Sequence, residues 1–127
     1  VQEQLKKTRA ALEKNNGLTL ILALSYGGRT ELVEAIREIS TKVKQGKIEA
    51  AEINEKTISE HLYTRHYPEP DLLIRTSGEM RVSNFLLWQI SYSEFVVTPT
   101  LWPEFRREQF FDALEEYARR HRRFGGV

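Results

Sequence analysis

Apolar and polar positions first follow a helical period and then form a short apolar run. Residues 1–14 place Val1, Leu5 and Leu12 on one face among charged side chains, which predicts an amphipathic helix. The run 18–24 (LTLILAL) is almost continuously apolar and lies between glycines. A short apolar run bounded in this way predicts a strand buried on both faces, as in a parallel sheet.

Helical spacing returns after this run. Apolar side chains recur at i, i+4, i+7 and i+11, at Leu32, Ile36, Ile39 and Val43. Thr30 is the expected N-cap of this helix, and Glu31 then places a negative charge in its first turn. Farther along, Thr57 and Glu60 have the spacing of a capping box, which predicts a second, short helix.

The second half of the sequence alternates between strand and helix patterns. Residues 71–75 (DLLIR) and 94–97 (EFVV) are two more apolar runs of strand length. Between them Ser83 can cap a helix through 85–90, and a last helix is expected around 110–117. Strands that alternate with helices predict an α/β fold with a mainly parallel central sheet flanked by helices.

Composition narrows the class of protein. The chain has 127 residues, no cysteine and a net charge of +1. The absence of cysteine excludes a disulfide scaffold, thiol catalysis and cysteine-bound metal. The apolar run 18–24 is too short to span a membrane, and the polar start does not resemble a signal peptide. We therefore expect a cytoplasmic protein. Because the chain begins with Val1 in helix-like sequence, we also expect it to be part of a longer protein.

Positive charge gathers near the end of the chain. The segment 119–123 (RRHRR) contains no acidic residue, so it could meet phosphate, nucleic acid or an acidic partner. The near-zero net charge argues against a nucleic-acid-binding domain, which is expected to be basic.

Two loops follow predicted strands, at the sheet edge where open α/β folds bind ligands. The loop 25–30 (SYGGRT) could face an anion, although two glycines alone are more typical of an ordinary turn. The loop after residue 74 holds Arg75, Arg81 and Ser83, and arginine suits bidentate contact with phosphate oxygens. A solvated loop in which an arginine pairs with Glu79 explains the same spacing equally well.

Glu94 is a candidate ligand for a hard cation such as Mg²⁺, because a carboxylate oxygen suits such ions. An edge charge or a helix-end partner explains Glu94 without any metal, and this second interpretation is favoured by the spacing alone. The sequence contains no HExxH, GxSxG or Walker A motif, so zinc hydrolysis, a nucleophile elbow and a P-loop lack support.

Several motifs together resemble cis-prenyltransferases. The most specific are 70–79 (PDLLIRTSGE) and 81–89 (RVSNFLLWQ), and the pattern continues at 16–20, 26–29, 92–95 (YSEF), 101–105 (LWPEF) and 122–126 (RRFGG). The resemblance implies an enzyme that adds isopentenyl diphosphate to an allylic diphosphate, usually farnesyl diphosphate, with Mg²⁺. The product is then a membrane-lipid-like polyprenyl diphosphate, so contact with a membrane surface is also expected.

The resemblance also assigns roles. It implies that substrate diphosphates contact Arg75, Arg81, Val82, Ser83, Arg123 and Gly125. It maps Glu94 onto a Mg²⁺ ligand, and it places Arg123 and Gly125 across the interface of a homodimer. These assignments favour the diphosphate interpretation of the 75–83 loop.

One departure limits what the chain does alone. Members of the family also have an amino-terminal half with a Mg²⁺-binding aspartate and an allylic diphosphate loop, and neither occurs here. The resemblance thus implies that 1–127 is the carboxy-terminal part of a single domain, inactive by itself, with its catalytic residues elsewhere. A non-catalytic accessory subunit and a nucleic-acid-binding module with a basic tail stay as alternatives. Retention of Arg75, Arg81, Ser83 and Glu94 favours a catalytic origin.

Overall fold

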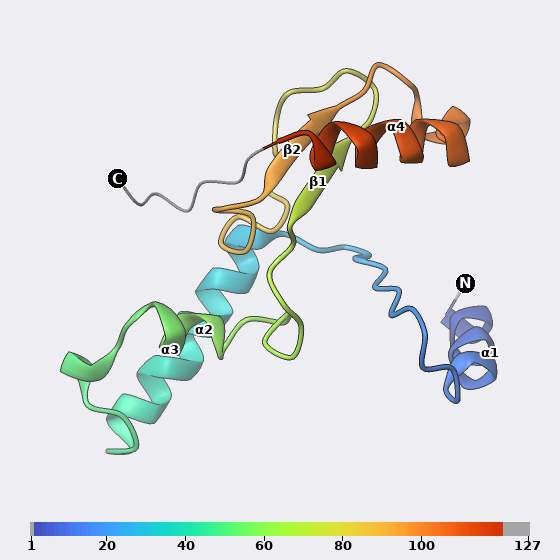
Figure 1. The fold of residues 1–127 in the computed structure, drawn as a ribbon. Coiled ribbons are helices and arrows are strands. Elements are labelled where there is room, and N and C mark those ends of the chain that lie inside the picture. The colour runs from blue at the N-terminus through green and yellow to red at the C-terminus, as the bar shows by residue number, and fades with distance from the viewer. Residues whose placement is uncertain (1, 121–127) are drawn as a thin grey trace.

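The computed structural model describes residues 2–120, and Figure 1 shows their arrangement. The α-helices of this range are α1 (Gln2–Leu12), α2 (Gly28–Lys44), α3 (Glu55–Ser59) and α4 (Arg107–Ala118). The strands are β1 (Leu72–Arg75) and β2 (Glu94–Val97), and the short 3₁₀ helices are η1 (Ala50–Glu52) and η2 (Trp102–Glu104). None of the helices in residues 2–120 is long and apolar enough to cross a membrane.

The two strands form a parallel sheet, which confirms the expected α/β class. Leu72 pairs with Glu94 at one end and Arg75 pairs with Val97 at the other. Helix α4 packs against β2, and α2 packs against α3. The most buried apolar side chains are Ala35, Ile39, Leu62, Ile90, Val96 and Ala113.

The predicted strand at 18–24 is wrong for the described structure. The segment is an extended connection between α1 and the rest of the fold, visible in blue in Figure 1. Leu18 is 89% exposed and Leu20 is 73% exposed. A strand buried on both faces needs neighbours in the sheet and covering layers. Within residues 2–120 the sheet consists of β1 and β2, so this run has neither.

The predicted helix after Ser83 is also absent, and residues 83–92 form successive turns. Ser83, Asn84 and Leu86 have φ angles of 54°, 62° and 45°. A right-handed helix requires negative φ at every residue, so these three residues prevent it. The apolar pattern there instead reflects burial of turn residues such as Ile90.

Two helix starts differ from the predicted caps. Helix α2 begins at Gly28 after Gly27, so Thr30 lies inside its first turn. Helix α3 begins after Asn54, whose Oδ1 accepts a hydrogen bond from the Thr57 amide at 3.1 Å. Thr57 is thus the third helical residue and returns a hydroxyl contact to the Asn54 amide. The capping box exists, but it starts three residues earlier than the sequence pattern suggested.

Candidate functional site

The loop that follows β1 folds back beside the end of β2. Ser77 and Gly78 donate backbone hydrogen bonds to Thr100 and Thr98, both at 2.9 Å. Ser77 and Gly78 also have positive φ, which turns the chain sharply. A cavity of about 260 Å³ lies under this loop, lined by Leu73, Arg75, Glu79, Met80, Arg81, Phe95 and Val97. The structure thus brings Arg75 and Arg81 to one cavity.

The two arginines differ in their environment. The Nε atom of Arg75 is buried and has no hydrogen-bond partner among the described residues. A buried donor without a partner costs free energy, so this group is suited to receive a ligand oxygen. The side chain of Arg81 is 69% exposed, and its Nη1 forms an ion pair with Glu79. The alternative arginine–glutamate pair is therefore present at Arg81, and an anion there would compete with Glu79.

Two of the remaining predicted substrate residues, Val82 and Ser83, do not line this cavity. Ser83 is exposed and Val82 is partly buried, on the same loop beyond Arg81. Arg123 and Gly125 lie outside the described residues.

Glu94 lies at the other end of the sheet from the loop. It is paired with Leu72, the first residue of β1, whereas Arg75 is the last. Its Oε2 lies 2.9 Å from Arg120 Nη1. The hydrogen bond to Glu94 is the main cause that raises the pKa of Arg120, and Glu116 adds to it.

This arrangement bears on the expected Mg²⁺. Among residues 2–120, no group of three or more histidine, aspartate or glutamate side chains is placed to hold a metal ion. Glu94 forms an ion pair with the Arg120 guanidinium. The described residues therefore do not form a Mg²⁺ site by themselves, and Glu94 as a ligand stays a prediction.

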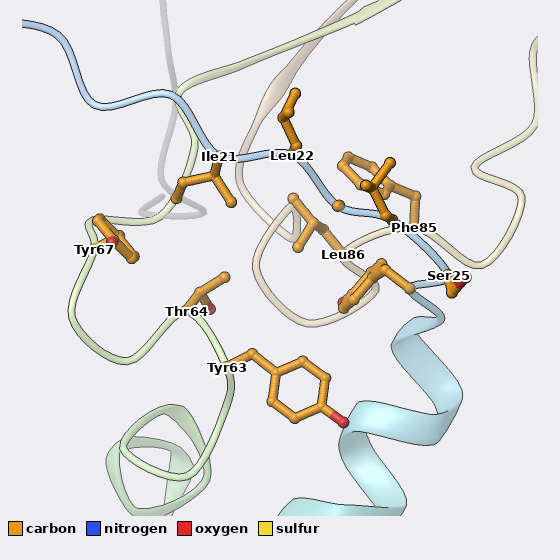
Figure 2. Close-up of a pocket in the computed structure, with 11 residues that line it drawn as sticks. Ile21, Leu22, Ser25, Tyr63, Thr64, Tyr67, Phe85 and Leu86 are labelled. Atoms are coloured by element: carbon orange, nitrogen blue, oxygen red, sulfur yellow. The ribbon is translucent and has the colours of Figure 1, made fainter. Parts of the chain in front are cut away.

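A second, larger cavity of about 390 Å³ was not anticipated from the sequence. Figure 2 shows Ile21, Leu22, Tyr63, Tyr67 and Phe85 around it. The ring of Tyr26 contacts those of Phe85 and Tyr63 edge to face, with centroids 5.7 and 6.3 Å apart. The lining comes from three distant segments without a common period. The aromatic residues themselves were the available signal.

Glu31, expected only to suit the helix dipole, is the polar centre beneath this cavity. The residue is 1% exposed, and its carboxylate accepts hydrogen bonds from three groups. These are the Tyr26 hydroxyl, the Tyr63 amide at 2.7 Å and Gln89 Nε2 at 3.1 Å. Burial, reinforced by Glu31, raises the pKa of Tyr26 well above its usual value. Glu31 thus joins α2 to two separate loops.

Comparisons with known proteins agree with the motifs. A prenyltransferase family model, described as undecaprenyl diphosphate synthase, matches residues 1–125. The isoprenyl transferase of Heliobacterium mobile is 51% identical over 126 residues, 99% of this chain and 48% of that protein. The ditrans,polycis-undecaprenyl-diphosphate synthase of Haemophilus influenzae, named as specific for (2E,6E)-farnesyl diphosphate, is 48% identical. That alignment spans 100% of this chain and 53% of the relative.

Solved structures give the same result. Lavandulyl diphosphate synthase from Lavandula x intermedia, in complex with dimethylallyl diphosphate, superposes with a TM-score of 0.91 at 42% identity. That match covers 98% of this chain and 54% of the other. A probable undecaprenyl diphosphate synthase from Campylobacter jejuni gives 0.77 at 31% identity, with 98% and 56% covered. The chain spans about half the length of the curated relatives it matches. On this evidence the chain belongs to the undecaprenyl diphosphate synthase family of prenyltransferases.

Proposed function

We propose that this chain carries the isopentenyl diphosphate site of a cis-prenyltransferase, as the carboxy-terminal half of its domain. The complete enzyme would condense isopentenyl diphosphate onto an allylic diphosphate, farnesyl diphosphate, to make an undecaprenyl-type diphosphate for a cell-wall lipid carrier. The observation that carries the proposal is the cavity shared by Arg75 and Arg81, with the buried Arg75 Nε lacking a partner.

The chemistry of the cavity suits a small molecule with a charged head and a short apolar tail. Arg75 and Arg81 supply guanidinium donors, which bind phosphate oxygens strongly. Leu73, Phe95 and Val97 form an apolar wall beside them. The arginines would hold the diphosphate while the apolar wall restricts the tail, so that the alkene has one direction of approach.

The other assignments rest on the family motifs. Val82 and Ser83 would contact the same diphosphate once a ligand fills the cavity. Arg123 and Gly125 would reach a diphosphate in the second subunit of a homodimer. Mg²⁺, when bound, would neutralise charge on the departing diphosphate. Glu94 would serve as one ligand only if Arg120 moves away and further oxygen donors are supplied.

Isothermal titration of the chain with isopentenyl diphosphate tests the proposal. Arg75→Ala and Arg81→Ala should each raise Kd by about 10-fold or more, because a charged hydrogen bond contributes about 1.5–3 kcal/mol. Arg9→Ala is the matched control, since it removes the same charge from α1, which does not line the cavity. An equal loss in all three variants would show only general attraction of an anion.

The chain alone should show no prenyl transfer. Incubation with isopentenyl and farnesyl diphosphates and Mg²⁺, followed by chromatography of the lipid products, checks this. A cis-polyprenyl diphosphate product would contradict the proposed division of the active site.

A further inference from the structure

The loop 81–86 carries three proposed substrate residues, Arg81, Val82 and Ser83, in a strained conformation. Ser83, Asn84 and Leu86 all have positive φ. Residues other than glycine adopt such angles at a cost and keep them only where the surrounding structure imposes them. Contacts from outside the loop must therefore hold it.

Those contacts come from the amino end of α2. The Gly28 amide donates to the backbone oxygen of Asn84 at 2.7 Å, and the Arg29 amide donates to its Oδ1 at 2.9 Å. The first amides of a helix have no partner inside the helix, and Gly27 offers no side chain to cap them. Asn84 therefore caps α2 from another part of the chain.

The two glycines allow this close approach. A Cβ on Gly28 would lie 3.1 Å from the Leu87 amide nitrogen and 3.3 Å from the Asn84 oxygen. A Cβ on Gly27 would lie 2.9 Å from Asn84 Nδ2. Neither glycine has a positive φ, so their lack of a side chain serves contact rather than backbone freedom.

Helix α2 is itself held in place by hydrogen bonds to other segments of the chain. Its buried Glu31, one turn after Gly28, holds the Tyr63 amide and the Gln89 side chain. The loop 81–86 is thus fixed to a helix that is itself fixed to two other segments.

We propose that Asn84 is a positioning residue for the isopentenyl diphosphate site. Its two hydrogen bonds to α2 hold the loop 81–86 in its left-handed turns and thereby fix the direction of Arg81 and Ser83. Asn84 acts through these two neighbours and does not itself bind the diphosphate. This inference rests on the proposed function.

Three substitutions separate the side-chain bond from backbone strain. Asn84→Gly tolerates the φ of 62° and keeps the backbone oxygen, so it removes only the Oδ1 bond. Asn84→Asp keeps an oxygen acceptor at that place. Asn54→Gly is the matched control, because it removes the same kind of amide-to-Oδ1 bond at the start of α3.

The experiment combines amide hydrogen exchange, titration with isopentenyl diphosphate and urea unfolding on the 127-residue chain. Asn84→Gly should lose protection at the Arg29 amide and raise Kd about fivefold, the equivalent of one hydrogen bond. Asn84→Asp should recover the protection and most of the affinity. Asn54→Gly should lower the urea midpoint and leave Kd unchanged.

Two results would overturn the role of Asn84. One is an unchanged Kd in Asn84→Gly although the Arg29 amide has lost protection. The other is a loss of affinity that follows the urea midpoint equally in Asn84→Gly and Asn54→Gly. If instead the unmodified chain does not bind isopentenyl diphosphate, the proposed function fails. Backbone chemical shifts then show whether the two hydrogen bonds of Asn84 to α2 hold the loop 81–86. Changes confined to 81–86 in Asn84→Gly support this role, and their absence refutes it.

Discussion

Arg120 Nη1 lies 2.9 Å from Glu94 Oε2 and 2.8 Å from the carbonyl oxygen of Phe95. The same guanidinium pairs with Glu116 through Nη2. One side chain thus joins the end of α4 to the first two residues of β2. The carboxylate that the family motif assigns to a metal is held by a cation in this structure.

Arg120→Ala should lower the urea midpoint of unfolding, because the Arg120 side chain links α4 to β2. The side chains of Arg120 and Glu94 are 33% and 25% exposed, so solvent screens them only in part. Arg119→Ala is the control: its pair with Glu115 is local to the helix and 78% and 67% exposed. Urea unfolding should show a smaller change of the midpoint in Arg119→Ala than in Arg120→Ala. Equal effects would mean that the contact with β2 contributes nothing.

Glu94→Gln and Arg120→Gln in the complete enzyme should shift the Mg²⁺ concentration required for prenyl transfer in opposite directions. Removing the carboxylate raises the Mg²⁺ concentration needed, because an oxygen ligand loses its charge. Removing Arg120 lowers it, because the carboxylate loses its competing cation. Rates of prenyl transfer by the complete enzyme across a Mg²⁺ series measure both. Identical Mg²⁺ curves in the two variants would exclude Glu94 from the metal site.

Glu31→Ala should destabilise the chain by about 2–4 kcal/mol, because the Tyr63 amide and the Tyr26 hydroxyl lose their acceptor and Gln89 Nε2 keeps only its bond to Thr64 Oγ1. Glu34→Ala is the comparison, since its contact with the Tyr63 hydroxyl is exposed, and it should cost well under about 1 kcal/mol. Chemical denaturation of both variants measures the difference. Similar midpoints would contradict the role of Glu31 as the polar centre.

Much of the fold could be predicted from local pattern. The strands β1 and β2 follow from apolar runs of the right length, and α2 and α4 follow from helical spacing. The presence of Arg75 and Arg81 at one cavity follows from their place on a loop after a parallel strand. These features depend on residues close together in the sequence.

The predictions from the sequence were wrong where contacts between residues distant in the sequence determine the local structure. The run 18–24 has the composition of a buried strand, but burial requires partners that a local pattern does not reveal. The turns after Ser83 include Asn84, which accepts a hydrogen bond from the Arg29 amide of α2, 55 positions away in the sequence. The pairing of Glu94 with Leu72, at the opposite end of the sheet from Arg75, is likewise set by the parallel register and not by a local pattern.

Tyr26 and Tyr63 should ionise only above the usual range for tyrosine. Burial first, and then Glu31, raises the pKa of Tyr26, and the hydrogen bond to Glu34 raises the pKa of Tyr63. Because both folded pKa values exceed the ordinary 10.0, their contribution to stability is complete below pH 10.0 and is lost as the pH rises from there through the folded pKa values. Ultraviolet titration should show that Tyr26→Phe and Tyr63→Phe remove amplitude only from the late part of the curve.

Leu20→Ala should change the free energy of unfolding of this chain by less than about 0.5 kcal/mol, because an exposed side chain has few contacts to lose. Leu62→Ala removes the same atoms from a side chain that is only 1% exposed, and it should cost about 2–5 kcal/mol. Urea unfolding of the two variants compares them directly. A large loss in Leu20→Ala would show that the run 18–24 is packed in solution, and it would restore the buried strand that the sequence pattern predicts. A small loss would instead leave an apolar segment open to solvent, and Leu20→Lys should then reduce self-association measured by light scattering.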